Sequence, residues 1–305
     1  MPPRSPLPTR YGLAAAWVCT PDRDASQPLP WSTMSVWLRD KLTERVQVAR
    51  LLDEERFVYA DGSPVAGNDP YAPHTFVWFH RDLPDETPVA GQIQIVHRDE
   101  RLVVIDKPAF LSSIPRGQHI RESVVVRLRE GLGLPELTPL HRLDRITSGL
   151  LVCATQQRWR GPYQSLFQSG GMAKTYRALA PICDDLELPT TVANHISKPR
   201  GATRAEVTPG APINAETHVT LETHIDGLGL YRLIPRTGRT HQLRVHLNDL
   251  GIPIVGDPLY PNDLAVAIDD FSQPLQLLAA EIAFVDPIDG AQRRFVSTRQ
   301  LPLSP

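Results

Sequence analysis

The feature that most constrains this chain is a series of short, strand-like apolar segments that begins after residue 91. In the same stretch, segments with helical spacing occur only at 122–130, 163–168 and 242–248. The order lacks the regular alternation of strands and helices that a doubly wound parallel sheet needs. It predicts an α+β fold with a large mixed, mainly antiparallel sheet flanked by helices and loops. The expected strands cover residues 92–96, 102–105, 149–154, 175–180, 216–223, 228–235 and 281–285.

The first 88 residues differ from this pattern and divide into two parts. Residues 1–33 are rich in proline and small polar residues, which predicts a loosely ordered arm. Residues 34–88 combine the spacing of one or two short helices with a hairpin pattern, an order that resembles the S4-like α/β RNA-binding module. Acidic residues stand at 53–55, where such modules usually carry basic ones, so a degenerate, structural version is the alternative. Residues 89–305 are expected to form the main domain.

The charge of the chain is nearly balanced overall but is unevenly distributed. The net charge is −2, which by itself argues against a protein that binds nucleic acid. Between His141 and Cys183, however, six lysines and arginines accompany a single acid, and residues 228–248 carry four arginines and no acid. Such segregation is compatible with a basic cleft on a neutral body, or with arginines scattered over the surface.

The cysteines and the apolar runs bear on compartment and membrane association. Cys19, Cys153 and Cys183 are widely spaced and odd in number, which predicts no disulfide framework and favours a reducing cytoplasm. No apolar run approaches the ~20 residues of a membrane helix. The short run over 13–18 is interpreted as neither a signal nor an anchor. We expect a cytoplasmic protein without a membrane segment and, by default, a monomer.

The segment with the clearest chemical character covers residues 141–152. Asp144 lies between Arg142 and Arg145 on an expected turn, which leads into a strand through Gly149. The flanking arginines favour the ionised carboxylate, and this suits an acceptor or nucleophile better than a general acid. A turn-capping aspartate with solvated arginines is the alternative interpretation of the same residues.

A second basic segment, residues 236–246, combines a tight turn with the start of a helix. On that helix Arg244 can point into a site, while Arg239 binds phosphate from the preceding loop. A basic turn with satisfied histidines is the alternative. His241 and His246 are five residues apart, a poor spacing for two ligands on one helical face, and neither a cysteine nor a carboxylate completes a cluster. We therefore expect no metal site.

Four motifs follow one another in the second part of the chain. They are VIDKPA at 104–109, HRLDRITSGLL at 141–151, KTYRA at 174–178, and a final signature made of TGRTHQLRVH at 237–246 and GIPIVGDPLY at 251–260. In sequence and in order these motifs resemble those of the RluA-type pseudouridine synthases. With their flanking strands they span about residues 92–296, roughly two thirds of the chain. The resemblance implies the pseudouridine synthase fold, with the catalytic domain over 89–305.

The resemblance also implies roles for individual residues. Asp144 corresponds to the catalytic aspartate, Tyr176 to the tyrosine that stacks on the target base, and Arg244 to the arginine that pairs with the aspartate. Arg142 corresponds to the arginine that helps to hold the displaced RNA. The implied reaction isomerises a flipped-out uridine in rRNA or tRNA and needs no cofactor. The residues assigned to RNA contact are Arg142, Arg145, Lys174, Arg239, His241 and Gln242.

Some positions depart from the family pattern. Phe110 and Pro181 stand where glycine is usual or common, and Leu278 stands where a histidine is frequent. Gly161-Pro162 interrupts a segment that is normally a longer helix. These departures motivate one alternative function, an RNA-binding or ribosome-assembly factor that has lost catalysis on the same scaffold.

A second alternative is a carboxylate-dependent hydrolase. Such an enzyme needs another acid near Asp144 to complete an acid–base pair. Asp106 and Asp257 are the acids within the motifs that are available for this role. Both stand in turn-like contexts, before lysine or proline, which disfavours the hydrolase.

Overall fold

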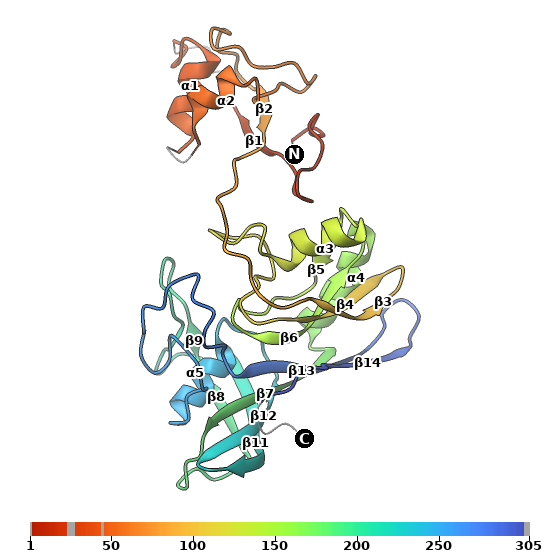
Figure 1. Cartoon of the computed structure of the whole chain (residues 1–305), viewed down its shortest axis with the longest axis vertical. Helices are drawn as coiled ribbons and strands as arrows, with labels where there is room; N and C mark the ends of the chain where they lie inside the picture. The colour runs from red at the N-terminus through yellow and green to blue at the C-terminus, as the bar shows by residue number, and fades with distance from the viewer. Residues whose placement is uncertain (1, 23–27, 44–45, 302–305) are drawn as a thin grey trace. The chain divides into compact units, whose positions relative to one another are not determined.

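The computed structural model describes residues 2–22, 28–43 and 46–301 and divides the chain into two compact units (Figure 1). The first unit is Met1–Asp85 and the second is Glu86–Pro305. The boundary between them falls close to residue 88, where the sequence pattern changes. Among the helices within the described ranges, none is long and apolar enough to cross a membrane.

The first unit contains two short helices and a two-stranded sheet. Helices α1 (Met34–Lys41) and α2 (Val48–Asp53) occupy the stretch that was predicted to form one or two short helices. Strand β1 (Ala16–Cys19) pairs antiparallel with β2 (Phe76–Phe79). β1 lies within the segment 1–33, for which the composition predicts a loose arm, and it is part of the folded unit. Its apolar tetrapeptide suits a strand, and the proline-rich average of the whole segment concealed it.

The second unit is built on a ten-stranded sheet (Figure 1). In sheet order the strands are β3 (Gln94–Arg98), β4 (Leu102–Lys107), β6 (Ser148–Ala154), β13 (Leu277–Val285), β7 (Met172–Pro181), β12 (Leu228–Pro235), β11 (Ala215–Ile225) and β8 (Thr190–Asn194), with β5 (Thr138–Pro139) beside β6 and β14 (Gln292–Val296) beside β13. β6 and β13 pair in parallel, and the other neighbours pair antiparallel. A separate antiparallel ribbon contains β9 (Ile196–Ser197) and β10 (Glu206–Val207). The predicted α+β fold with a mixed, mainly antiparallel sheet is confirmed.

Two helices cover opposite faces of the β3–β4–β6 half of the sheet. Ile105 of β4 packs in the cluster that includes α3 (Val124–Leu132), whereas its neighbour Val104 packs in the cluster that includes α4 (Gln157–Ser169). Successive side chains of a strand point to opposite faces, so a wholly buried strand supplies both layers. Each fully buried aliphatic side chain contributes about 1.5–3 kcal/mol.

Helix α4 is longer than the sequence predicted. The helix runs through Gly161 and Pro162, which we expected to interrupt it. Tyr163, the next residue, is fully buried, and its hydroxyl donates to the carboxylate of Asp286 with both O–O distances at 3.0 Å. This packing offsets the cost of proline inside a helix, which is about 3 kcal/mol.

Helix α5 (Gln242–Asp249) covers one face of the other half of the sheet. Leu243 and Leu247 pack in a cluster with apolar residues of β7, β12 and β11, including Ala178 and Leu233. Because residues three and four apart share one side of a helix, this packing fixes the rotation of α5 about its axis. The direction in which Arg244 points is fixed with it.

The two halves of the sheet meet at a close contact between β6 and β13. Gly149 of β6 has φ +107°, and a Cβ on it would lie 2.4 Å from the carbonyl oxygen of Ala279 on β13. Only glycine fits such an approach. Leu278, which stands where the family often has histidine, is buried here opposite Ser148. The turn that carries Asp144 enters the sheet at this contact.

Candidate active site

The turn that carries Asp144 is held by hydrogen bonds on both sides. Nε2 of His141 accepts the backbone N–H of Val152 at 3.1 Å. The hydroxyl of Ser113 donates to the carbonyl of Leu143 at 2.8 Å and accepts its N–H at 3.1 Å. Burial lowers the pKa of His141 to about 3, so the imidazole is neutral and remains an acceptor. The turn therefore has a defined position before any substrate binds.

Lys107 supports the same turn from the end of β4. Its amine is buried and donates to the carbonyl oxygens of Pro108 at 3.0 Å, Leu111 at 2.8 Å and Arg145 at 3.1 Å. Burial lowers the pKa of Lys107 to about 7, and the negative charge of Asp144 opposes this shift. Sequence reasoning recognised Lys107 only as a motif residue. Its place just after the apolar run 102–105 was the signal that this amine would be buried and would need acceptors.

Arg244 is the best-fixed cation of the site. Its Nε and Nη2 donate to the two carboxylate oxygens of Asp257 at 2.7 and 2.6 Å, and both side chains are buried. Asp257 also accepts the backbone N–H groups of Leu259 at 2.9 Å and Tyr260 at 3.2 Å. A two-point arginine–carboxylate contact fixes the guanidinium plane as well as its position.

Asp144 meets the remaining side of this guanidinium. Its Oδ2 lies 3.3 Å from Nη1 of Arg244 and 3.9 Å from Nε2 of His241. The Asp144 side chain is 35% exposed, whereas that of Arg244 is 3% exposed. The structure thus confirms the predicted pairing of the aspartate with Arg244, and it leaves the carboxylate accessible to a ligand.

His241, which was predicted to contact RNA, lies beside Asp144 and Arg244. It precedes α5 in a left-handed conformation, with φ +56°, and its Nδ1 lies 3.0 Å from the hydroxyl of Tyr260. Burial, followed by the positive charge of Arg244, lowers the pKa of His241 to about 4 against the opposing charge of Asp144. At neutral pH His241 is therefore uncharged and adds no second positive charge beside Asp144.

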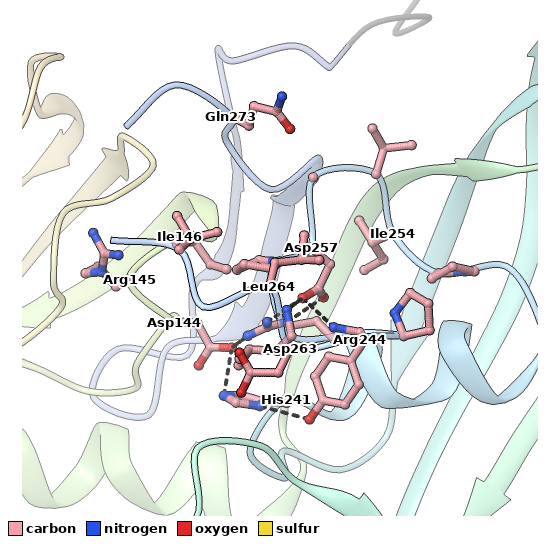
Figure 2. A pocket seen from close by; sticks show the side chains of 18 of the residues that line it. Asp144, Arg145, Ile146, His241, Arg244, Ile254, Asp257, Asp263, Leu264 and Gln273 are labelled. Carbon is pink, nitrogen blue, oxygen red and sulfur yellow. Dashed lines mark hydrogen bonds and ion pairs between the residues drawn. The ribbon is translucent and has the colours of Figure 1, made fainter. Parts of the chain in front are cut away.

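These groups open into a cavity of about 910 Å³ (Figure 2). Figure 2 shows Asp144, His241 and Arg244 converging, with Asp257 on another side of the guanidinium. The cavity is also lined by Phe110, which has φ +67° where the family usually has glycine. Phe110 therefore adopts the backbone conformation that glycine favours, at a cost of about 1 kcal/mol or more.

Tyr176 lies on β7 and is half-buried against core residues of both halves of the sheet. Burial and, second, the negative charge of Asp144 raise the pKa of its phenol, so the hydroxyl stays protonated near neutral pH. Tyr176 is not among the residues that line the cavity beside Asp144. Its stacking on a base stays a prediction.

The residues that were assigned to RNA contact lie in different environments. Arg142 is exposed, and the exposed Arg239 donates from Nε to the carbonyl of Asn214 at 3.0 Å. Arg145 is partly buried, with its guanidinium 5.7 Å from the centre of the Phe110 ring. Burial lowers the pKa of the Lys174 amine.

Gln242 requires a correction. It is buried, and its side-chain amide donates to the carbonyl of Glu216 and to the hydroxyl of Thr217, both at 3.0 Å. Its amide oxygen accepts from the hydroxyl of Thr237 at 2.8 Å and the N–H of Arg239 at 2.9 Å. The prediction that Gln242 binds RNA was therefore wrong, because this amide is occupied in bracing the turn that leads into α5.

The second acid that a hydrolase requires is not provided by the two candidates. The carboxylate of Asp257 is occupied by Arg244 and by backbone N–H groups. Asp106 is fully buried, accepts from Ser297 at 2.7 Å, and lies 3.2 Å from Nε of Arg299. Neither carboxylate is exposed to act on a substrate beside Asp144.

Comparisons with known proteins agree with this geometry. The sequence matches the RNA pseudouridylate synthase family model over residues 101–249. It is 34% identical to the dual-specificity RNA pseudouridine synthase RluA of Vibrio vulnificus over 211 residues, which is 64% of this chain and 78% of the relative. The chain belongs to the RNA pseudouridine synthase family. The resemblance that the four motifs indicated is confirmed.

Further relatives and solved structures of the family show the same extent of similarity. RNA pseudouridine synthase 7 of rice (Oryza sativa subsp. japonica) is 32% identical over 73% of this chain, which spans only 56% of that protein. Among solved structures, human RNA Pseudouridylate Synthase Domain Containing 1 superposes with a TM-score of 0.56 at 25% identity, covering 71% of this chain and 86% of the human one. Human RNA Pseudouridylate Synthase Domain Containing 4 gives 0.52 at 26% identity, covering 69% and 89%.

Proposed function

We propose that this family member converts specific uridines of RNA to pseudouridine and that Asp144 is the group that acts on the nucleoside. One observation carries the proposal: a partly exposed carboxylate faces a large cavity beside an arginine that Asp257 holds in place. A fixed cation next to a carboxylate stabilises its negative charge without reorganisation during the reaction. Both a nucleophile and a base need the carboxylate form.

The reaction conserves all atoms and electrons of the nucleoside. The bond between N1 of uracil and C1′ of ribose breaks, the base rotates, and a bond forms between C5 and C1′. The proton on C5 is lost and a proton is added to N1, so no oxidant or reductant is needed. Asp144 can take part by attacking the sugar, by attacking the base or by abstracting a sugar proton. In each route the uridine must first leave its helix, at a cost of a few kcal/mol.

The remaining side chains have supporting roles in this proposal. Arg244 stabilises the negative charge of Asp144, and Tyr176 offers its ring to the extruded base. Arg142, Arg145, Lys174 and Arg239 supply positive charge for phosphates along the RNA path. His241, being neutral, lies 3.9 Å from Asp144 as an uncharged neighbour and is not assigned to a phosphate contact.

We also propose that the RNA is ribosomal or transfer RNA. The names of relatives support this substrate class: one is called a dual-specificity RNA synthase, and a Vibrio cholerae protein that is 32% identical over 64% of this chain is called tRNA pseudouridine synthase C. The predictions of a cytoplasmic monomer and of RNA binding by an S4-like first unit are kept as further proposals. The three cysteines are free thiols, which suits a reducing compartment.

Mapping of pseudouridines tests the proposed function and identifies the substrate. Total RNA from host cells with and without this gene is labelled chemically and analysed by mass spectrometry. We expect at least one pseudouridine to disappear on deletion and to return with the wild-type gene but not with Asp144→Asn. If no site changes and the purified protein binds RNA without isomerising it, the function is that of an RNA-binding scaffold.

A further inference from the structure

One wall of the active-site cavity is an exposed apolar loop. We define the cleft loop as residues 261–271, of which 261–270 are all exposed. Leu264 and Val266 are 63% and 48% exposed, and both line the cavity that contains Asp144. Figure 2 shows Leu264 among the side chains around Asp144 and Arg244. Single exposed apolar residues are common, but two on one wall of an active site mark a contact surface.

The cleft loop is held in a defined conformation. At its start, the N–H of Leu264 donates to the carbonyl of Pro258 at 2.9 Å. At its end, the ring of Phe271 packs 5.3 Å from that of Phe110, which in turn lies against Arg145 of the catalytic turn. Ala265, between the two apolar side chains, has φ +49°. A residue other than glycine in this region is strained, and such strain persists where the surroundings impose it.

The composition of the cleft loop selects bases over phosphates. The loop carries three aspartates, at 263, 269 and 270, and no lysine or arginine. Negative charge repels RNA phosphates, whereas apolar side chains can pack against the flat faces of unstacked bases. The basic groups of the cavity, Arg145 and Arg244, come from other segments. A nucleotide whose base contacts the cleft loop therefore has its phosphate pointing away from that loop.

The size of the cavity leaves room for more than the reacting base. Sites for single small ligands usually measure ~300–1,000 Å³, and this cavity of about 910 Å³ lies near the upper end. Asp144 contacts only one part of its wall. The apolar pair on the cleft loop is available to a neighbouring nucleotide of the same RNA.

We propose that Leu264 and Val266 form a second nucleobase subsite, which packs against an unstacked base next to the target uridine. The inference rests on the proposed function, because it requires that RNA enters this cavity. It assigns to the cleft loop a share of RNA affinity that depends on the bases and not on the backbone. The subsite contributes to binding and leaves the chemistry at Asp144 unaffected.

The test compares a double and a single substitution in the cleft loop. Leu264→Ser with Val266→Ser removes the apolar wall, while Ile268→Ser replaces a residue that is 45% exposed but does not line the cavity. All proteins carry Asp144→Asn, so that no turnover occurs during binding. The Kd is measured by fluorescence anisotropy for a labelled ten-nucleotide oligouridylate and for the same oligomer with one central uracil and abasic ribose elsewhere.

We expect the double substitution to raise the Kd for oligouridylate at least about tenfold, because full burial of even one such side chain corresponds to about that factor. Ile268→Ser should change it less than twofold. For the single-uracil oligomer, the Kd of the double variant should equal that of the protein with the unmodified cleft loop. An unchanged Kd for oligouridylate, an equal effect of Ile268→Ser, or an equal loss on the single-uracil oligomer would each overturn the subsite.

The failure of the proposed function can be told apart from the failure of this inference. Total RNA from cells that lack the gene is incubated with the enzyme that carries Asp144, and pseudouridine is counted. Absence of product contradicts the synthase activity. The Kd comparison needs no turnover and decides the subsite in either case. Matching thermal unfolding of the loop variants shows that a change in Kd is not a loss of fold.

Discussion

Two aspartates flank Arg244 in opposite environments. Asp257 has a fully buried side chain, binds the guanidinium through both oxygens, and accepts two backbone N–H groups as well. Asp144 is 35% exposed, touches the guanidinium at 3.3 Å through one oxygen, and faces the cavity. The same pair of residue types thus serves two purposes.

The difference shows how a site can keep one carboxylate accessible to a substrate while a second carboxylate fixes the neighbouring cation. A carboxylate whose lone pairs are occupied orients its partner and has little capacity left for a substrate. Asp257 pre-organises Arg244 in this way, and Arg244 then acts on Asp144 without needing to be fixed by it. Asp144 keeps most of its hydrogen-bonding capacity for the nucleoside.

Asp144→Asn should abolish catalysis and leave the fold intact. The amide keeps the shape of the side chain but cannot act as a nucleophile or base, so we expect kcat to fall by about 10⁴-fold or more. Stability should change by less than about 1 kcal/mol, because the carboxylate is partly exposed and Arg244 keeps its buried partner Asp257. Pseudouridine formation and thermal unfolding measure the two quantities. Activity near the wild-type level would remove Asp144 from the chemistry.

Asp257→Asn should show the reverse pattern. It leaves the buried charge of Arg244 without its main partner, and breaking a buried pair costs about 3–5 kcal/mol. We expect a large fall in the denaturant midpoint together with a smaller loss of kcat than in Asp144→Asn. Both variants remove a charge without changing the shape of the side chain. The difference in stability between them therefore reports the environment of each carboxylate. Equal stability of the two variants would contradict the account.

Acid should destabilise the fold gradually through three histidines. Burial lowers the pKa of His141 to about 3 and those of His241 and His246 to about 4, against an unfolded value of ~6.5. The unfolded chain therefore binds more protons between these values, so stability is present above pH ~6.5 and is lost as pH falls towards 4. Each histidine removes roughly 2 kcal/mol between pH 7 and pH 5.

His246→Gln is a matched control for this pH dependence, because His246 lies outside the cavity and bonds to Asn194. Urea unfolding at pH 7, 6 and 5 should show a smaller loss of stability on acidification in the variant. If the variant lost stability as steeply as the wild type, the pKa of His246 would not differ between the folded and unfolded states.

Gln242→Ala should have the smallest effect. It removes the amide that braces the turn before α5, at a cost of about 1–2 kcal/mol. Since the amide is buried, we expect a lower melting temperature and a Kd for RNA that stays within about twofold of the wild-type value. A selective loss of RNA binding at unchanged stability would restore the original assignment of Gln242 to RNA contact.

Much of this architecture follows from local patterns. The strands of the main sheet were visible because buried strands are continuous apolar runs, and α5 because its apolar spacing fits one face. Short edge strands such as β8 and β14 were not predicted. Their exposed, polar residues carry little periodic signal, and their pairing depends on neighbours distant in sequence.

Site residues were predictable where a reactive side chain stands in a recognisable motif. They were less predictable where tertiary packing determines the partners of a side chain. Asp144 and Arg244 were predicted from charge, spacing and family resemblance. The role of Asp257 in holding the Arg244 guanidinium was not predicted, because an acid before a proline has the local pattern of a turn. Gln242 was misassigned for a related reason: a polar residue in a basic motif indicates surface, and only the folded chain shows the acceptors and donors around it.

The most direct test is the rate of pseudouridine formation at saturating RNA, measured side by side for Asp144→Asn and Asp257→Asn at a temperature where both are folded. We expect no detectable product with Asp144→Asn and a reduced but measurable rate with Asp257→Asn. Product from Asp144→Asn at a rate similar to that of Asp257→Asn would show that the exposed carboxylate is not the reacting group.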